Sequence, residues 1–291
     1  MPRAGLNAPA LRDVLEDLRL RYDGRFLDSD PIGIVRRFDD PEDREIVGLI
    51  AAGLAYGRVA SIRASLTDLL GRIGPHPARA VTSFDPARDA HRFDGFVHRF
   101  TRGRHIALLL HLLRQAKERA GTLEAFFREG DEDPQASTLG SALDVFGARL
   151  FSLDARPFTE DGTIPRNDGA RWLLPLPAAG SACKRSCLFL RWMVRPDDGV
   201  DCGVWNRVSP SRLILPLDTH LVRVVRALGW TRRKSVGWPM ALEVTARLRA
   251  LDSADPIRFD FALSRLGILG LLDAPGGRLT GRTLRRALEG R

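Results

Sequence analysis

Residues 183–194 read CKRSCLFLRWMV, a segment in which one lysine, Lys184, stands at the start of an apolar run. The preceding residues 176–182, LPAAGSA, have mostly small side chains and predict a turn that leads into a helix. Residues 216–220, PLDTH, follow downstream, and Asp218 lies 218 − 184 = 34 positions after Lys184. We expect these segments to decide the fold and the site, because each predicts a helix that begins beside a reactive group.

Lysine is rare in this chain. Only Lys117, Lys184 and Lys234 stand among the 45 basic residues, and all the others are arginine. A guanidinium stays protonated and cannot act as a nucleophile, whereas an amine can. The segment 202–242 contains seven basic residues and a single acid, Asp218. A lone amine and a lone carboxylate in a basic environment therefore form a candidate pair.

The hydrophobic pattern predicts an all-α protein, because we find no convincing alternation typical of strands. Asp40-Pro41-Glu42-Asp43 is a typical helix start, with a capping acid, a proline at the first helical position and further acids in the first turn. Small residues among the apolar ones over 46–54 predict a central buried helix that ends near residues 56–58. Further helices are predicted over 62–73, 104–119, 139–151, 183–194, 218–228, 237–251 and 256–267, with irregular segments at 130–134 and 154–170.

The composition is ordinary for a soluble globular protein except for its charge. A net charge of +9 and a pI near 10.5 predict a polyanionic partner such as nucleic acid. A biased genome would explain arginine in place of lysine, but not the positive excess. We see neither a signal-peptide core nor an apolar run of membrane-spanning length, and the three cysteines lack the paired spacing of a disulfide framework. We therefore expect a cytoplasmic, nucleoid-associated protein with no membrane contact.

Lys184 and Asp218 each have a functional and a purely structural interpretation. An amine at the start of an apolar helix suits Schiff-base chemistry, but a lysine can also lie along apolar surface with its charge in solvent. Asp218 stands where a helix cap is expected, and a capping carboxylate can also act as a general base. Free backbone amides at both helix starts, including those near Gly180 and Ser181, can bind phosphate.

Several motifs, in order along the chain, resemble a family of bacterial proteins known only as conserved hypothetical. They are AYGR at 55–58, GSACKR at 180–185, FLRWMVR at 189–195, PLDTH at 216–220 and FDFAL at 259–263. The arrangement also resembles the helix-hairpin-helix DNA glycosylase superfamily, in which a hairpin precedes a catalytic lysine and a catalytic aspartate starts a later helix. The separation of Lys184 from Asp218 is closest to that in the archaeal 8-oxoguanine glycosylases.

The resemblance implies a fold and a reaction. It implies two helical lobes with a cleft between them, within a single helical unit of residues 1–291. Lobe A would comprise residues 45–195, and lobe B would comprise residues 1–44 and 210–291, including a basic tail from Gly276. Lys184 would attack C1′ of a damaged nucleotide and form an imine, and Asp218 would stabilise the sugar cation, with the target base flipped out of duplex DNA.

The sequence departs from the superfamily at the hairpin. That hairpin usually reads Leu-Pro-Gly-x-Gly with the lysine two residues later. Here residues 176–180 read LPAAG, without the first glycine, and Lys184 comes four residues after Gly180. No four-cysteine cluster follows near the C-terminus, so no iron–sulfur cluster, and no other cofactor, is expected.

Other residues are candidates for contacts with DNA. Tyr56 and Arg58 stand where related glycosylases place a wedge, although a helix terminus with an aromatic staple explains them equally well. Trp205 lies in a polar loop and could stack on a base. His220 could tune Asp218 or contact phosphate. The candidate phosphate ligands are Arg185, Arg191, Arg207, Arg212 and Arg223.

A metal site is not expected. Cys183, Cys187 and Cys202 could be combined with His220 as zinc ligands, but a Cys-x3-Cys spacing on a buried helix is not a usual zinc knuckle.

Taken together with the resemblance, the sequence favours a DNA-repair glycosylase with lyase activity, and no obligate protein partner is inferred. A non-catalytic nucleic-acid-binding protein on the same scaffold and an unrelated lysine-dependent enzyme remain as alternatives.

Overall fold

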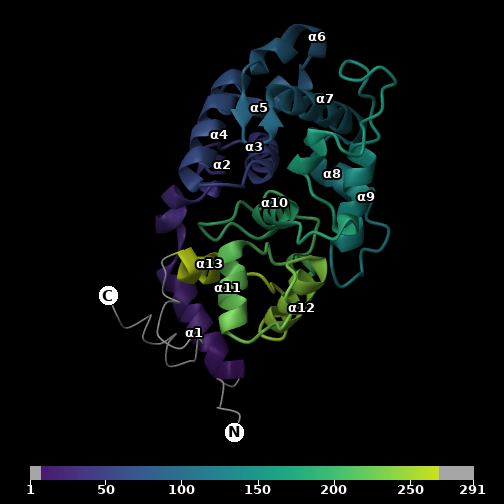
Figure 1. Ribbon diagram of the computed structural model, residues 1–291. Coiled ribbons are helices and arrows are strands. Elements are labelled where there is room, and N and C mark those ends of the chain that lie inside the picture. The colour runs from purple at the N-terminus through teal and green to yellow at the C-terminus, as the bar shows by residue number, and fades with distance from the viewer. Residues whose placement is uncertain (1–7, 269–291) are drawn as a thin grey trace.

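The computed structural model describes residues 8–268, and this part of the chain is mostly helical (Figure 1). The α-helices are α1 Ala8–Arg21, α2 Ile32–Val35, α3 Pro41–Gly53, α4 Val59–Ile73, α5 Pro77–Thr82, α6 Pro86–Asp89, α7 Gly103–Ala120, α8 Leu123–Arg128, α9 Gly140–Leu150, α10 Lys184–Val194, α11 Thr219–Ala227, α12 Trp238–Arg249 and α13 Asp260–Ile268. Between residues 8 and 268, five 3-10 turns accompany them: η1 Gly24–Ser29, η2 Ala90–Phe93, η3 Gly169–Leu173, η4 Pro177–Ala179 and η5 Pro210–Arg212. Within residues 8–268, no helix combines the length and hydropathy needed to span a bilayer.

The predicted helical class is confirmed, with one small exception. Strands β1, Val97–His98, and β2, Thr101–Arg102, form an antiparallel hairpin in which Val97 pairs with Arg102 and His98 with Thr101. Two residues per strand are too few to produce an alternating pattern that can be recognised in the sequence. The hairpin lies between η2 and the start of α7 in the chain.

Most predicted helix boundaries agree with the structure. The Asp40 carboxylate accepts a hydrogen bond from the amide of Glu42 at 2.7 Å, as expected of a cap at the start of α3. The last helix begins at Asp260 rather than at 256, because residues 256–259 form turns. Helix α1 was not predicted, although Val14, Leu15 and Leu18 on one face are buried at the helical spacing.

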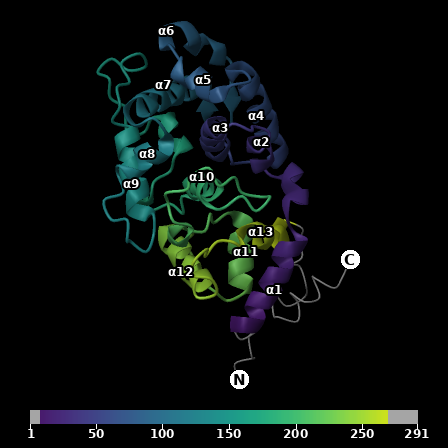
Figure 2. The ribbon, with the colours of Figure 1, turned by 180° about the vertical axis from the view of Figure 1, so that it is seen from behind.

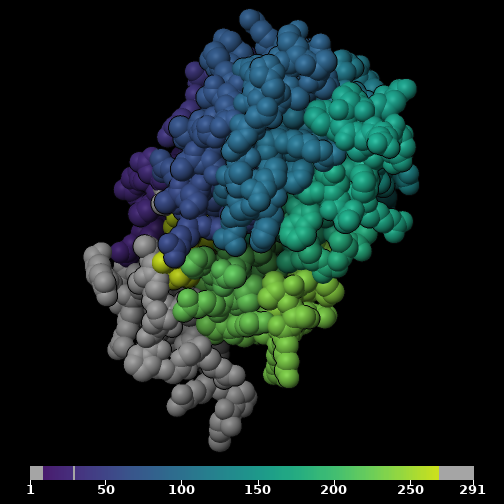
Figure 3. Space-filling model, turned by 45° about the horizontal axis from the view of Figure 1, so that its top comes forward, coloured from purple at the N-terminus to yellow at the C-terminus, as the bar shows by residue number. Residues whose placement is uncertain are grey.

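Helix α10 lies in the middle of the molecule (Figures 1 and 2). Helices α2–α9 lie on one side of it, and α1 with α11–α13 lies on the other. The space-filling view shows the green part of the chain packed directly against the blue and teal parts (Figure 3). The segments on both sides of α10 therefore share one hydrophobic core.

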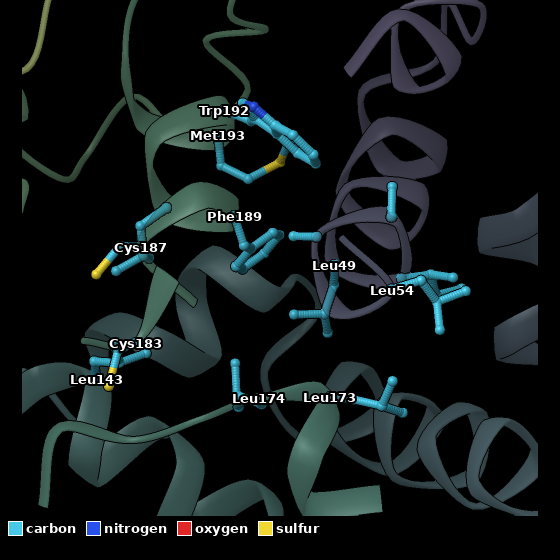
Figure 4. Close-up of a cluster of buried hydrophobic side chains, with 14 of the residues drawn as sticks. Leu49, Leu54, Leu143, Leu173, Leu174, Cys183, Cys187, Phe189, Trp192 and Met193 are labelled. Atoms are coloured by element: carbon cyan, nitrogen blue, oxygen red, sulfur yellow. The ribbon is translucent and has the colours of Figure 1, made fainter. Parts of the chain in front are cut away.

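The contact between α3 and α10 is close because α3 contains small residues. A Cβ atom at Gly48 would lie 2.7 Å from Cε of Met193, so a larger residue would force the Met193 side chain to move. Phe189, Trp192 and Met193 point from α10 toward α3 (Figure 4). The prediction of a central buried helix over 46–54 is thereby confirmed.

Helices α1 and α2, both within residues 1–44, pack against different partners. Helix α1 packs against α13, and α2 packs against α3. Ile32, Ile34 and Val35 of α2 are buried, so this short helix packs its apolar face against α3. The basic tail from Gly276 lies outside the described residues.

A buried network of charges holds α10 to the C-terminal helices. Arg191 Nη1 donates to Asp260 Oδ2 at 2.6 Å, and its Nε donates to Asp201 at 3.2 Å. Arg195 bonds both Asp201 and Asp255. Burial disfavours the charged form, but Asp201 and Asp260 outweigh it and raise the pKa of Arg191 above its ordinary value. The guanidinium is therefore a structural charge in the interior.

We expect Arg191→Met to destabilise the protein by about 3–5 kcal/mol, because Asp260 would stay buried without the guanidinium that neutralises it. Chemical denaturation followed by circular dichroism measures the loss. Arg88→Met is the matched control: Arg88 pairs with Asp89 at an exposed site, so the change should stay within about 0.5 kcal/mol. A loss at position 191 no larger than that of the control would contradict a structural role for the network.

Candidate functional site

The turn before α10 brings Lys184 to the first position of that helix. Turn η4 is followed by Gly180 in a left-handed conformation, with φ of 76°. Cys183 is also left-handed, with φ of 50°, and the helix begins at the next residue. The amide of Trp238 donates to the Gly180 carbonyl at 3.3 Å, so the start of α12 supports the turn. The turn predicted at 176–182 is thus confirmed.

Lys184 and Asp218 meet, although they are far apart in the sequence. Nζ of Lys184 lies 3.9 Å from Oδ2 of Asp218 and donates a hydrogen bond to the carbonyl of Ala55 at 3.3 Å. The two side chains are 35% and 21% exposed, which leaves both within reach of a bound molecule. The predicted proximity of the amine and the carboxylate is confirmed.

The two oxygens of Asp218 have different partners. Oδ1 accepts a hydrogen bond from the amide of Leu221 at 2.7 Å and caps α11, whereas Oδ2 faces Lys184. The cap determines the direction of the carboxylate, and the second oxygen is available for chemistry. The capping and functional interpretations of Asp218 are therefore compatible.

Tyr56 and Arg185 connect this pair to the β-hairpin. The Tyr56 hydroxyl donates to the carbonyl of His98 at 2.9 Å and lies 2.8 Å from Oγ1 of Thr101. The Arg185 guanidinium lies over the Tyr56 ring, 5.1 Å from its centroid, and burial lowers the pKa of this arginine. The half-buried ring of Tyr56 supports the hairpin in this structure. The wedge expected from the resemblance would instead project from the surface.

Three of the predicted DNA contacts, Arg191, Trp205 and Arg212, have side chains in the interior, so they are not accessible to DNA in this structure. Arg191 is 4% exposed and belongs to the buried network described above. Trp205 is 2% exposed, and its indole Nε1 donates to Glu45 at 2.7 Å. Arg212 is also buried and forms a bidentate ion pair with Asp131. These residues stabilise the fold and present no charged or aromatic surface to a partner.

The remaining predicted residues lie at or near the surface. Arg58, Gly180, Ser181, Arg207 and Arg223 are exposed. His220 is half-buried in the first turn of α11, and its Nδ1 is buried without a hydrogen-bond partner. A Cβ atom at Gly267 would lie 2.8 Å from Cβ of His220, so α13 packs tightly against this histidine.

The three cysteines are buried, free thiols. Burial raises the pKa of Cys183 and that of Cys202 to about 11, and it raises the pKa of Cys187 well above its ordinary value. All three are protonated at neutral pH, so Cys183 does not compete with Lys184 as a nucleophile. Across the described residues, no group of three or more His, Cys, Asp or Glu residues is arranged to hold a metal ion.

Asp260 is a neighbour of the site that sequence reasoning did not single out. Burial raises its pKa to about 6, although the Arg191 guanidinium opposes the shift, and the charge of Asp218 adds to it. The buried Asp260 carboxylate is therefore close enough to Asp218 for the two charges to interact. The motif at 259–263 was noted in the sequence, but its position relative to Asp218 becomes clear only from the packing of α13 against α11.

Comparison with known proteins identifies a family without assigning an activity. The model of the family described as "Protein of unknown function (DUF2400)" matches residues 30–269, so the chain belongs to that family. No curated protein and no solved structure shows a significant match to the chain.

We expect Asp218→Asn to keep the stability of the protein within about 0.5 kcal/mol, because asparagine caps a helix as well as aspartate does. Asp218→Ala should cost about 1 kcal/mol, since the amide of Leu221 would lose its partner. Urea denaturation of both variants measures the difference. Equal losses in the two variants would mean that the contact with Lys184, rather than the cap, stabilises α11.

Proposed function

We propose that this member of the DUF2400 family is a DNA N-glycosylase with lyase activity that acts through a Schiff base on Lys184. The observation that carries the proposal is the approach of Nζ of Lys184 to Oδ2 of Asp218, at 3.9 Å. A nucleophilic amine with a directed carboxylate beside it is the arrangement that amine-dependent displacement at a sugar carbon requires. The scarcity of lysine in the chain adds support.

We further propose that the fold is of the helix-hairpin-helix glycosylase type, with two helical lobes and a cleft between them. In support, the Gly180 turn precedes α10, and each member of the pair stands at the start of a different helix. The turn departs from the superfamily, because η4 is a single 3-10 turn and Ala178 occupies the position of the first glycine. The amide of Ala178 is bonded to Asp144, so phosphate contacts would come from the residues after Gly180.

In the proposed reaction, Nζ of Lys184 forms a bond to C1′ while the bond from C1′ to the base breaks. The electron pair of that bond leaves with the base. Asp218 takes the proton that the attacking nitrogen loses and passes it to the departing base. The C1′–O4′ bond then opens as O4′ takes a proton from water, which gives a protonated imine. Asp218 removes a proton from C2′, and the 3′ phosphate leaves with the electron pair of the C3′–O bond, which cleaves the strand.

Double-stranded, damaged DNA is the proposed substrate, with an oxidised purine as the first class to test. The net charge of +9 favours a polyanion, and the proposed location is the nucleoid. The target nucleotide must leave the base stack to reach Lys184, because a duplex otherwise shields C1′ from a protein side chain. Arg58, Arg207 and Arg223 are exposed, and they are the proposed phosphate contacts.

We expect wild-type protein to be trapped covalently by borohydride on duplexes that contain an abasic site or an oxidised guanine. Lys184→Arg should lose the trapped product while its DNA affinity stays within about threefold, because the positive charge is retained. Denaturing gel electrophoresis measures the covalent product, and fluorescence anisotropy measures binding.

Lys234→Arg is the matched control, because Lys234 is an exposed lysine away from the Asp218 carboxylate and its substitution should leave trapping intact. Tight, salt-dependent binding without trapping over a panel of lesions would favour the non-catalytic alternative. The absence of any salt-dependent DNA affinity would overturn both and favour a lysine-dependent enzyme with a small carbonyl substrate.

A further inference from the structure

The tip of the β-hairpin presents an exposed aromatic ring beside a second one. Phe100 is 64% exposed and Trp172, in η3, is 56% exposed. Their ring centroids lie 5.9 Å apart at an interplanar angle of 51°, so the two rings contact each other and still offer surface to solvent. Large aromatic side chains are costly to leave in water, and such an exposed pair is typical of a binding surface.

The backbone of the hairpin tip is held in an unfavourable conformation. Arg99 and Phe100 are the two residues between the paired strands, and Arg99 has a φ of 52°. A two-residue hairpin normally places glycine or asparagine at such a position, because a side chain there is strained. The chain keeps an arginine instead, and its guanidinium lies 5.6 Å from the centroid of the Phe100 ring.

The charge around this pair of rings is positive. The segment 96–104 reads FVHRFTRGR and contains three arginines and no acid. Arg99 and Arg102 are exposed, whereas Arg104 is paired with Asp168. Aromatic faces flanked by arginine match a nucleobase attached to a phosphate backbone, since the base stacks and the phosphate is neutralised.

The hairpin tip is also continuous with the candidate site. A Cβ atom at Gly57 would lie 3.1 Å from Cδ of Arg99, so the arginine stem passes closely over the end of the segment 55–57. Tyr56 in that segment bonds the hairpin, and the carbonyl of Ala55 accepts the hydrogen bond from Lys184. The aromatic surface is thus connected to Lys184 through three consecutive residues.

We propose that Arg99, Phe100 and Trp172 form a stacking platform for an unpaired nucleobase of the nucleic acid that binds at Lys184. This inference takes the identity of the ligand, a nucleic acid, from the proposed function. It does not depend on the reaction proposed for Lys184. The platform would receive a base next to the reacting nucleotide, and Arg99 would contact the adjoining phosphate. It replaces Trp205, which lies in the interior, as the aromatic contact with DNA.

The test uses the full chain and duplex oligonucleotides that carry 2-aminopurine as a single unpaired base. Stacking quenches the fluorescence of this base analogue. We expect wild-type protein to quench it, and Phe100→Ala and Trp172→Ala each to abolish the quenching and weaken binding roughly tenfold. Phe100→Tyr should restore both. Leu20→Ala, a change of a similarly exposed apolar residue on the distant α1, is the control and should alter neither (Figure 1).

Arg99→Gly separates binding from folding. It should lower the slope of log affinity against log salt by about one, since one phosphate contact is lost. The melting temperature should stay the same or rise, because glycine adopts the positive φ without strain. A merely structural role for Arg99 would instead lower the melting temperature and leave the salt slope unchanged.

The outcomes distinguish this inference from the proposed function. If Phe100→Ala and Trp172→Ala bind as wild type does while wild type is trapped by borohydride, the platform is wrong and the glycosylase stands. If wild type is never trapped but both variants lose quenching, the platform stands and the chemistry is wrong. Loss of self-association in Phe100→Ala, measured by sedimentation with unchanged DNA affinity, would overturn the platform in favour of an interface between copies of the chain.

Discussion

The structure depends on the burial of α10 between two groups of helices. One side of this helix packs against the small residues of α3, and Arg191 on the helix is neutralised by Asp201 and Asp260. A buried guanidinium is tolerated only where carboxylates surround it, so the ion pairs align α10 with α13. Because α13 packs on α11, this alignment also determines where Asp218 stands relative to Lys184.

The relative position of Lys184 and Asp218 is therefore determined by the surrounding structural contacts rather than by the attraction between the two charges. A partly exposed ion pair contributes little to stability, and a separation of 3.9 Å is long for one. The cap of α11 directs Asp218, and the turn at Gly180 and Cys183 positions Lys184 at the start of α10. A site held by its surroundings leaves both functional groups available to a substrate.

Local features of the fold could be predicted from the sequence. The Asp40 cap, the small-residue pattern of α3 and the turn before Lys184 depend on neighbouring residues, and the structure agrees with all three. The proximity of Lys184 and Asp218 was predicted from scarce residue types and from the resemblance of the motifs. Helix α1 was missed even though its apolar spacing was present in the sequence.

Other contacts between distant segments could not be predicted in this way. Trp205 stands in a polar loop, and only the structure shows that Glu45, 160 residues away, accepts its indole hydrogen. One of the two carboxylates that bind Arg191, that of Asp260, lies 69 residues downstream and is buried with it. Phe100 and Trp172 come from segments with no shared motif, and the two-residue strands of the hairpin leave no periodic signal.

The distribution of lysines has a practical consequence. Lys117 is 6% exposed and bonded to Glu42 at 2.8 Å, which shields its amine from solvent. Lys184 is partly exposed, and Lys234 lies on the surface. Acylating reagents should therefore label two side-chain amines readily. Mass spectrometry can compare the labelling of Lys184 with that of Lys234 in the same molecule, which provides an internal standard for occupancy of the site.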